Sequence, residues 1–260
     1  MPRISAGKVL VTGASRGIGR AVVELLLDRG ASVAAVGREE DALVKLARRD
    51  PSRVTVIIGD VSDPSQRDRI VENAASALGG LDGLVCSAGI ARHQALGLID
   101  QATVERQLAV NFVAPLMLSQ DAARTMRLER KGGAIVHVSS TLALRPAPGT
   151  VVYGATKAAL NALTRGLAAE LAPDRIRVNA VLPGIVDTDM ARAPRLAPGE
   201  AMPVGEALDE RVDAQLEGFR SLHPLGRLGH ASEVAEAVVH LLDAEWTTGT
   251  LMVVDGGLTL

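Results

Sequence analysis

One tyrosine and one lysine stand four residues apart in a segment with helical periodicity. Tyr153 is the only tyrosine of the chain, and Lys157 is one of only four lysines. The segment continues to Leu171 with apolar or small residues at helical spacing. Side chains four positions apart share one face of a helix, so the phenol and the ammonium are expected to point into the same space. A nearby positive charge lowers the pKa of a phenol, which predicts a proton donor or acceptor that works near pH 7. The alternative is a helix with one aromatic and one charged residue at unrelated positions.

Composition and charge limit the classes to which the protein can belong. The chain has 260 residues, of which 47% are apolar and only 2% aromatic, so its core must consist of aliphatic residues. The net charge is −2 and no basic stripe is present, which argues against a nucleic-acid partner. One cysteine, Cys86, excludes an internal disulfide and fits a reducing compartment. No signal peptide or membrane-spanning apolar run is recognised, so we expect a cytoplasmic protein without a membrane partner. No metal site is expected.

A glycine-rich turn links the first predicted strand, residues 8–12, to a predicted helix over residues 20–28. Residues 12–19 read Thr-Gly-Ala-Ser-Arg-Gly-Ile-Gly. Glycines in this context allow a tight turn and a close approach of the backbone to a pyrophosphate, whose charge is met by the helix N-terminus. The pattern therefore predicts dinucleotide binding, the alternative being an ordinary glycine-rich turn.

The end of the second predicted strand, residues 31–36, bears on the choice of cofactor. A carboxylate there would accept hydrogen bonds from the 2′-hydroxyl of NAD, but this strand is followed by Gly37 and Arg38. The guanidinium groups of Arg38 and of Arg16, in the glycine loop, match a 2′-phosphate. NADP(H) is the predicted cofactor, NAD(H) remains possible, and the alternative is that both arginines are solvated surface residues.

Polar residues follow the later strands. Asp60 and Val61 follow the third predicted strand, residues 53–58, where the carboxylate can accept from an adenine amino group or simply cap a turn. Asn111 lies where a helical region over residues 100–130 is interrupted before a proline, and a kink there would turn a polar side chain inward. Ser139 and Ser140 end the fifth predicted strand, residues 134–138, at the edge where the sites of open parallel sheets gather.

The order of elements predicts the fold class. Seven strands alternate with helices, the fourth, sixth and seventh strands being placed at residues 81–87, 175–181 and 251–255. This pattern is typical of an α/β protein with a doubly wound parallel sheet, a three-layer αβα sandwich. We expect a single domain over residues 1–260. The proline-rich piece over residues 193–205 and the predicted helix after it suggest a lid over a site, at about residues 189–222.

Together these residues resemble the short-chain dehydrogenase/reductase family over essentially the whole chain, and within it the 3-oxoacyl-carrier-protein reductases. The resemblance rests on motifs that occur in the family's order: Thr12-Gly-Ala-Ser-Arg-Gly-Ile-Gly19, Asp60-Val61, Ala88-Gly89, Asn111, Ser140, Tyr153-Gly-Ala-Thr-Lys157, Pro183-Gly184 and Thr188. It implies a Rossmann fold. One departure is Cys86-Ser87 where the family often has asparagine, which puts in doubt a hydrogen bond that steadies the adjacent strands.

The resemblance also implies roles. Tyr153 would be the catalytic acid/base, Lys157 would bind the nicotinamide ribose and lower the pKa of Tyr153, and Ser140, with Ser139 as the fallback, would orient the substrate oxygen. Asn111 would hold a water in a proton relay to Lys157, and Thr188 would bind the carboxamide. The complete expected cofactor-binding set is Gly13, Ser15, Arg16, Gly17, Ile18, Gly19, Arg38, Asp60, Val61, Ala88, Gly89, Asn111, Tyr153, Lys157, Pro183, Gly184, Val186 and Thr188.

The expected function is an NADP(H)-dependent reduction of a ketone, 3-oxoacyl or related, to a secondary alcohol. The first alternative is an NAD(P)-dependent dehydrogenase of a cyclic alcohol or dihydrodiol, suggested by Asp187-Thr-Asp-Met190 and Pro224-Leu-Gly-Arg227. The second is a non-catalytic NADP(H) sensor on the same fold. The resemblance further implies a homotetramer with the Tyr153 helix and residues 253–260 at interfaces, although a dimer is possible. The apolar character of residues 142–152 and of the lid suggests a mostly hydrophobic small-molecule substrate.

Overall fold

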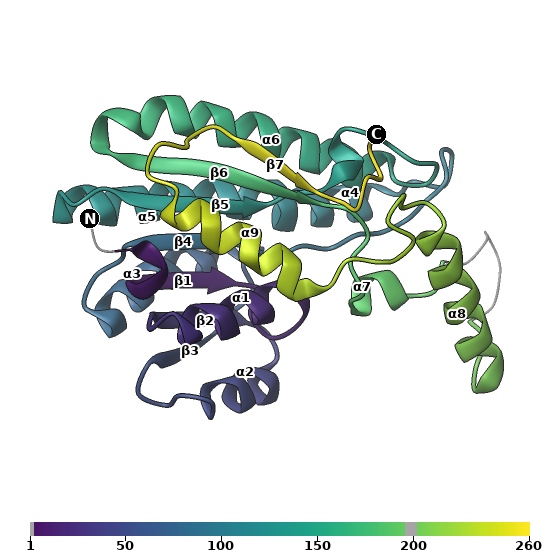
Figure 1. Ribbon diagram of the computed structural model, residues 1–260, viewed down its shortest axis with the longest axis horizontal. Coiled ribbons are helices and arrows are strands. Elements are labelled where there is room, and N and C mark those ends of the chain that lie inside the picture. The colour runs from purple at the N-terminus through teal and green to yellow at the C-terminus, as the bar shows by residue number, and fades with distance from the viewer. Residues whose placement is uncertain (1–2, 196–201) are drawn as a thin grey trace.

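A seven-stranded parallel sheet forms the centre of the molecule (Figure 1). The structure is a computed structural model, and it describes residues 3–195 and 202–260. The strand order is β3-β2-β1-β4-β5-β6-β7, and every neighbouring pair is parallel. The strands are β1 (Lys8–Thr12), β2 (Ser32–Gly37), β3 (Val54–Ile58), β4 (Gly83–Cys86), β5 (Gly133–Val138), β6 (Ile176–Pro183) and β7 (Leu251–Val254). This arrangement confirms the predicted doubly wound parallel sheet and Rossmann-type fold.

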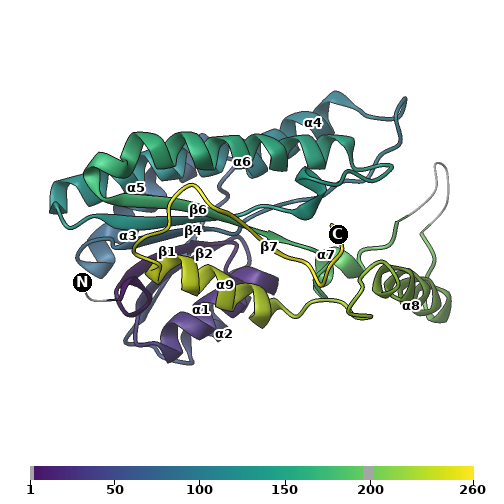
Figure 2. The same ribbon diagram turned by 45° about the horizontal axis from the view of Figure 1, so that its top comes forward.

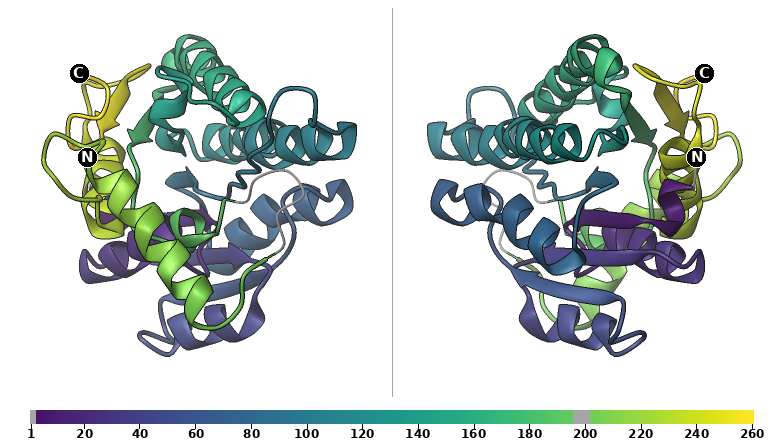
Figure 3. Two further views of the ribbon diagram at one scale, coloured as in Figure 1. Left: turned by 90° about the vertical axis from the view of Figure 1, so that its right-hand side faces the viewer. Right: turned by 90° about the vertical axis from the view of Figure 1, so that its left-hand side faces the viewer.

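Helices cover both faces of this sheet. They are α1 (Gly17–Asp28), α2 (Glu40–Ala47), α3 (Pro64–Leu78), α4 (Gln101–Leu108), α5 (Ala114–Glu129), α6 (Val151–Leu171), α7 (Asp189–Arg192), α8 (Glu206–Arg220) and α9 (Ala231–Asp243). Figures 2 and 3 show α1, α2 and α9 on one face and α3, α5 and α6 on the other. Each face has its own aliphatic core, and the central strands are buried on both sides. Such strands read as continuous apolar runs in the sequence because neither face meets water.

The helical region over residues 100–130 is interrupted as expected, and the interruption is a π-helical turn. A π-helical turn, Ala109–Val113, separates α4 from α5 and contains Asn111, whereas Pro115 lies in the first turn of α5, where its missing N–H is tolerated. A π-turn widens the helix and displaces backbone groups from the regular ladder, and such turns are frequent at functional sites. The prediction that Asn111 turns inward is correct, and Asn111 lies in the π-turn just before Pro115.

Two further expectations about helices need correction or restriction. Ser232 is of a type that commonly caps helices and was expected to begin α9, but the helix begins at Ala231 and Ser232 lies in its first turn. The N-cap is His230, whose backbone N–H donates to the Glu233 carboxylate (2.8 Å). The proposed lid contains α7 and α8, of which the short α7 was not expected. Residues 196–201 of that segment lie outside the described residues. No described helix is long and apolar enough to cross a membrane.

A buried histidine joins the sheet to two helices on one face. His137 in β5 is fully buried, with Nε2 3.0 Å from the Ser119 hydroxyl of α5 and Nδ1 2.9 Å from the Thr164 hydroxyl of α6. The Thr164 hydroxyl donates its own hydrogen to the Leu160 carbonyl (2.8 Å), so it accepts from His137 Nδ1–H and leaves Nε2 to accept from Ser119. Burial, followed by the charge of Lys157, lowers the pKa of His137 to about 3.

This depressed pKa predicts a pH-dependent contribution to stability. The imidazole titrates near 6.5 in an unfolded chain and near 3 in the folded one. Between these values the unfolded state binds more protons, so the contribution is present above pH 6.5 and falls by about 1.4 kcal/mol per pH unit as the pH drops towards 3. The difference in free energy of unfolding between the wild type and His137→Gln should therefore narrow from pH 7 to pH 5 in urea titrations. Ser119→Ala, which keeps the imidazole, should show no such narrowing, and a constant difference for both variants would contradict the assignment.

Candidate active site

A cavity lies at the carboxyl ends of the strands, where the strand order reverses between β1 and β4. Ligands of open α/β sheets bind at such a switch point, because the connections on its two sides diverge to opposite faces. The cavity is lined by every predicted site residue except one: Gly13, Ser15, Arg16, Gly17, Ile18, Gly19, Arg38, Asp60, Val61, Ala88, Gly89, Ser140, Tyr153, Lys157, Pro183, Gly184, Val186 and Thr188. Asn111 is the exception and lies behind the wall, with no exposed surface.

Tyr153 and Lys157 project from the first two turns of α6 into this cavity, as their spacing predicted. The Lys157 ammonium lies 5.7 Å from the centre of the Tyr153 ring and donates to the Val138 carbonyl at the end of β5 (2.9 Å). Both side chains are buried in the described structure. The helix and the strand end therefore hold the pair in place together.

The protonation of this pair differs from the sequence-based expectation. Burial raises the pKa of Tyr153 to about 12, although hydrogen bonding by Ser140 opposes the shift. Burial lowers the pKa of Lys157 to about 8. The expectation that Lys157 brings the pKa of Tyr153 towards neutrality is thus wrong for this structure, because burial disfavours the charged phenolate. Tyr153 is a neutral phenol at pH 7, ready to donate a proton.

Ser140 reaches the Tyr153 hydroxyl because the chain turns sharply after β5. The 3-10 turn Thr141–Ala143 follows, and the Ser140 side chain accepts a hydrogen bond from the Leu142 N–H (3.1 Å). The turn packs closely on α6 at Gly154, where a Cβ would lie 2.9 Å from the Leu142 carbonyl oxygen. The fallback residue Ser139 also lines the cavity, but its hydroxyl donates to the Lys157 carbonyl (3.2 Å). Ser140 is therefore the serine that faces the phenol.

Asn111 supports the cavity wall from behind. Its amide oxygen accepts from the Ile90 N–H (3.0 Å), and its amide nitrogen donates to the Ile90 carbonyl (2.9 Å) and to the Thr156 hydroxyl (3.1 Å). A Cβ built on Gly89 would lie 3.6 Å from the amide oxygen of Asn111 and 3.5 Å from Lys157 Nζ. The π-turn thus brings Asn111 close to the lysine, and its side chain fixes the loop after β4.

The glycine loop forms a cradle suited to a pyrophosphate. Helix α1 begins at Gly17, and no side chain caps its first turn, so its leading N–H groups face the cavity without a capping acceptor. Gly17 has a φ of +54°, and a Cβ there would lie 3.4 Å from the Thr188 side chain. A helix N-terminus with free donors binds anionic phosphate groups favourably. The residues present therefore fit a dinucleotide cofactor.

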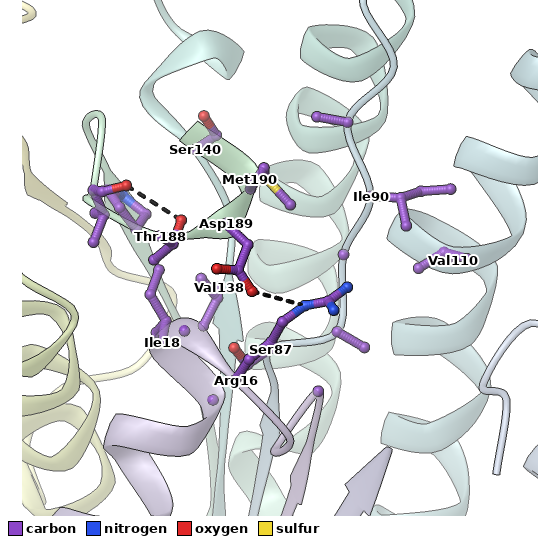
Figure 4. A pocket seen from close by; sticks show the side chains of 18 of the residues that line it. Arg16, Ile18, Ser87, Ile90, Val110, Val138, Ser140, Thr188, Asp189 and Met190 are labelled. Carbon is purple, nitrogen blue, oxygen red and sulfur yellow. Dashed lines mark hydrogen bonds and ion pairs between the residues drawn. The ribbon is translucent and has the colours of Figure 1, made fainter. Parts of the chain in front are cut away.

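The far corner of the cavity combines arginines with acids. Arg16 forms an ion pair with Glu39 (2.6 Å) and lies 3.8 Å from the Asp189 carboxylate at the start of α7, the dashed contact in Figure 4. Arg38 lies 3.8 Å from Asp60. The sequence has no carboxylate directly after β2 and was therefore expected to leave this corner without an acid, but Glu39 lines it together with Arg16 and Arg38.

Asp60 is held as a carboxylate by a residue that sequence reasoning missed. Arg106 of α4 donates to Asp60 (2.8 Å) and also contacts Ser62, whose N–H and hydroxyl donate to the same carboxylate at 2.9 and 2.6 Å. Burial opposes ionisation, but the hydrogen bonds from Ser62 and Arg106 outweigh it and lower the pKa of Asp60 to about 2. No local pattern marks Arg106, because it lies 46 residues after its partner.

The hydrogen bond put in doubt by the Cys86-Ser87 departure has a counterpart in this chain. The Thr12 hydroxyl accepts from the Ala88 N–H (3.3 Å) and donates to the Val85 carbonyl (3.5 Å). The Thr12 hydroxyl thus joins the end of β1 to the end of β4. In the family, the asparagine that is absent here is expected to stabilise these adjacent strands. Cys86 itself is buried, and burial raises the pKa of its thiol to about 12, so it is no nucleophile.

The comparisons with known proteins agree with this geometry. The family model described as short chain dehydrogenase matches residues 7–198. The chain belongs to the short-chain dehydrogenase/reductase family. It is 37% identical to an L-xylulose reductase of Caenorhabditis elegans over 97% of this chain and 95% of the relative, and 35% identical to a human 3-oxoacyl-[acyl-carrier-protein] reductase over 96% and 97%. Among solved structures, a short-chain type dehydrogenase/reductase from Mycobacterium marinum has a TM-score of 0.85 and 32% identity, covering 99% of this chain and 97% of that one.

Membership confirms the general chemistry expected from the motifs. This short-chain dehydrogenase/reductase is an oxidoreductase that acts on CH–OH and C=O groups of small molecules with a nicotinamide cofactor. Its resemblance to 3-oxoacyl-carrier-protein reductases is likewise confirmed by several relatives with that name. Beyond the predicted catalytic and cofactor-binding residues, the cavity is also lined by Glu39, Ser87, Ile90, Ala91, His93, Arg106, Val110, Val138, Leu142, Ile185, Asp189, Met190, Ala191 and Arg195.

Proposed function

We propose that this enzyme reduces a ketone to a secondary alcohol with NADPH, with Tyr153 as the proton donor. The observation that carries the proposal is the neutral, buried phenol of Tyr153, with Ser140 beside it in the cavity that also holds the glycine cradle. Reduction of a carbonyl needs a protonated acid at the start of the reaction, whereas alcohol oxidation needs a base. The phenol of Tyr153 is protonated at pH 7, as this first step of a reduction requires.

In this mechanism each polar residue has one task. The cofactor, when bound, supplies the hydride that the carbonyl carbon accepts. The Tyr153 hydroxyl gives its proton to the carbonyl oxygen, and the Ser140 hydroxyl donates a hydrogen bond to the same oxygen. The Lys157 ammonium favours the phenolate that remains on Tyr153, since opposite charges stabilise each other in a buried site. Asn111 holds the loop after β4 and, we propose, places a water for the return of the proton through Lys157.

The cofactor would lie along the cradle described above. Gly13, Ser15, Gly17, Ile18 and Gly19 would face its pyrophosphate, while Asp60 and Val61 would meet the adenine. Ala88, Gly89, Pro183, Gly184, Val186 and Thr188 would hold the nicotinamide half. In Figure 4 Thr188 and Ile18 lie close together at the helix N-terminus.

The first test is the absorbance change of the nicotinamide with purified protein. NADPH and NADH would be offered against acyl thioesters, cyclic ketones and diketones, and NADP⁺ and NAD⁺ against alcohols and dihydrodiols. Turnover of a carbonyl with NADPH supports the proposal. Preference for NAD⁺ with a cyclic alcohol or dihydrodiol would favour the alternative, a dehydrogenase that works in the oxidative direction. The position of Glu39 supports that alternative. Glu39 lines the far corner of the cavity together with Arg16 and Arg38. If the adenosine ribose of a bound cofactor lies there, this carboxylate can accept a hydrogen bond from the 2′-hydroxyl of NAD.

Arg38 provides a prediction about cofactor choice. If its guanidinium binds the 2′-phosphate, Arg38→Ala should raise the KM for NADPH about 10- to 100-fold, the loss expected for a charge-assisted hydrogen bond. The KM for NADH should change little, because NADH has no 2′-phosphate. Arg29→Ala, which removes an exposed arginine just after α1, is the matched control. Equal changes for both cofactors would contradict this role of Arg38.

We also propose a homotetramer that works in the cytoplasm, with residues 189–222 as a substrate lid on a single domain. Trp246 and Leu260, before and after β7, are fully exposed apolar side chains, which supports an interface there. The single cysteine, buried as a thiol, suits a reducing compartment. Light scattering measures the mass directly, and a monomer would contradict the assembly.

A further inference from the structure

One arginine of the cavity differs from the other three in its surroundings. Arg16, Arg38 and Arg106 each have a carboxylate within 4.0 Å. Arg195 also lines the cavity, but no carboxylate of the described residues lies within that distance of its guanidinium. Arg195 is exposed in the described structure, so its guanidinium is hydrated until an anion in the cavity joins it. The uncompensated charge of Arg195 is therefore available to a ligand.

Arg195 is held in place by helix α8. Its guanidinium carbon lies 4.5 Å from the centre of the Phe219 ring, a cation–π contact. Its backbone N–H donates to the side-chain oxygen of Gln215 (3.0 Å). Burial lowers the pKa of Arg195, yet a guanidinium remains protonated at pH 7. The charge is thus both permanent and positioned before any ligand arrives.

His93 lines the same cavity and contributes a second polar group. Burial, followed by the charge of Arg195, lowers the pKa of His93 to about 4, so its imidazole is neutral at pH 7. Its Nδ1 is buried and has no hydrogen-bond partner in the described structure. A neutral imidazole has one N–H, which can donate to an anion beside Arg195 without adding charge.

The cavity near Ser140 is otherwise largely apolar. Figure 4 shows Met190 and Ile90 beside the cavity, with Val110 next to Ile90. A substrate in this cavity would contact these apolar side chains with its hydrocarbon part. One uncompensated positive charge matches one negative charge, and a planar guanidinium matches a carboxylate in geometry.

We propose that Arg195 and His93 bind a carboxylate of the substrate, so that the enzyme reduces ketones that carry a carboxylate group. This inference rests on the proposed ketoreductase function and narrows its substrate class to oxo acids. The reaction is the same ketone reduction: the carbonyl carbon gains a hydride from NADPH, the carbonyl oxygen gains the proton of Tyr153, and the substrate carboxylate is unchanged. Arg195 determines specificity, and Tyr153 remains the acid.

The experiment compares each oxo acid with its own methyl ester. With NADPH, the wild type would be assayed on 3-oxobutanoate, 4-oxopentanoate and 5-oxohexanoate, which differ only in the distance from carbonyl to carboxylate, and on their esters. We expect a higher kcat/KM for at least one acid than for its ester. Arg195→Gln should lower kcat/KM for that acid about 10- to 100-fold, mainly through KM, and leave the ester and the KM for NADPH unchanged. Arg192→Gln is the matched control, because this lid arginine is paired with Asp187 (2.7 Å) and does not line the cavity.

The outcomes separate this inference from the proposed function. Turnover of the esters without a preference for any acid, a preference that survives in Arg195→Gln, or a rise only in the KM for NADPH would overturn the carboxylate site and leave the ketoreductase standing. If neither acids nor esters turn over, binding of pentanoate would be measured by the fluorescence of bound NADPH. Binding that is lost in Arg195→Gln would support the anion site while the proposed reaction fails, and absence of binding in the wild type would overturn both.

Discussion

Replacing the single tyrosine by phenylalanine should nearly abolish turnover while leaving the protein folded. Tyr153→Phe removes only the hydroxyl from a buried side chain, so packing is retained. Without that hydroxyl the substrate oxygen loses the proton donor that lies with Ser140 in the cavity. Loss of a general acid lowers the rate about 10²- to 10⁴-fold, and we expect a fall of this size in kcat. It is measured by the absorbance of NADPH with a carbonyl substrate of the wild type.

Controls for this variant distinguish a lost acid from a lost fold. The affinity for NADPH, followed by fluorescence, and the thermal unfolding temperature should both stay close to those of the wild type. Ser139→Ala is a useful companion, because Ser139 lines the same cavity yet bonds to the backbone of α6, and its kcat should fall far less. A Tyr153→Phe variant that keeps full biological activity but binds NADPH would instead favour the non-catalytic sensor.

The position of Tyr153 could be predicted from the sequence, but the direction of its pKa shift could not. The spacing of Tyr153 and Lys157 predicts correctly that both reach one cavity, because helix geometry is a local property. It predicts the wrong direction for the pKa of Tyr153, since burial depends on how α6 packs against β5 and the turn after it. The residues of α6 alone do not determine that packing.

The residues that the sequence identified share one property. Apart from Asn111, which lies in the π-turn between α4 and α5, each belongs to a short motif that follows a strand or lies near the start of a helix, as in the glycine loop after β1 and Ser140 after β5. The carboxyl ends of parallel strands meet at one edge of the sheet, so motifs that follow those strands lie close together. Predicting the parallel sheet was therefore enough to predict most of the site. Arg106 and Arg195 reach the cavity from α4 and from the segment after α7. Their positions depend on tertiary packing, and no spacing in the sequence marks them.

The glycine loop provides the second large effect. Gly19→Ala places a Cβ only 2.2 Å from the Gly13 carbonyl oxygen and 2.7 Å from its carbonyl carbon. These are backbone atoms, so the contact cannot be relieved by moving a side chain, and the loop or α1 must shift. We expect the affinity for NADPH to fall at least about tenfold, because the N–H groups of the first turn leave the pyrophosphate position. The free energy of unfolding should fall by about 1–3 kcal/mol, the usual cost of overpacking.

A matched substitution isolates the close approach from the general effect of adding a methyl group. Gly218 lies in α8, outside the cavity lining, and a Cβ there meets no atom within 4 Å. Gly218→Ala should leave the affinity for NADPH unchanged and raise stability by up to about 1 kcal/mol, since alanine favours a helix over glycine. Fluorescence titration and urea denaturation of both variants measure the contrast. If Gly19→Ala bound NADPH and unfolded like the wild type, the loop would have to tolerate a backbone shift without losing its cofactor. The close contact of α1 with β1 would then not be what positions the cradle.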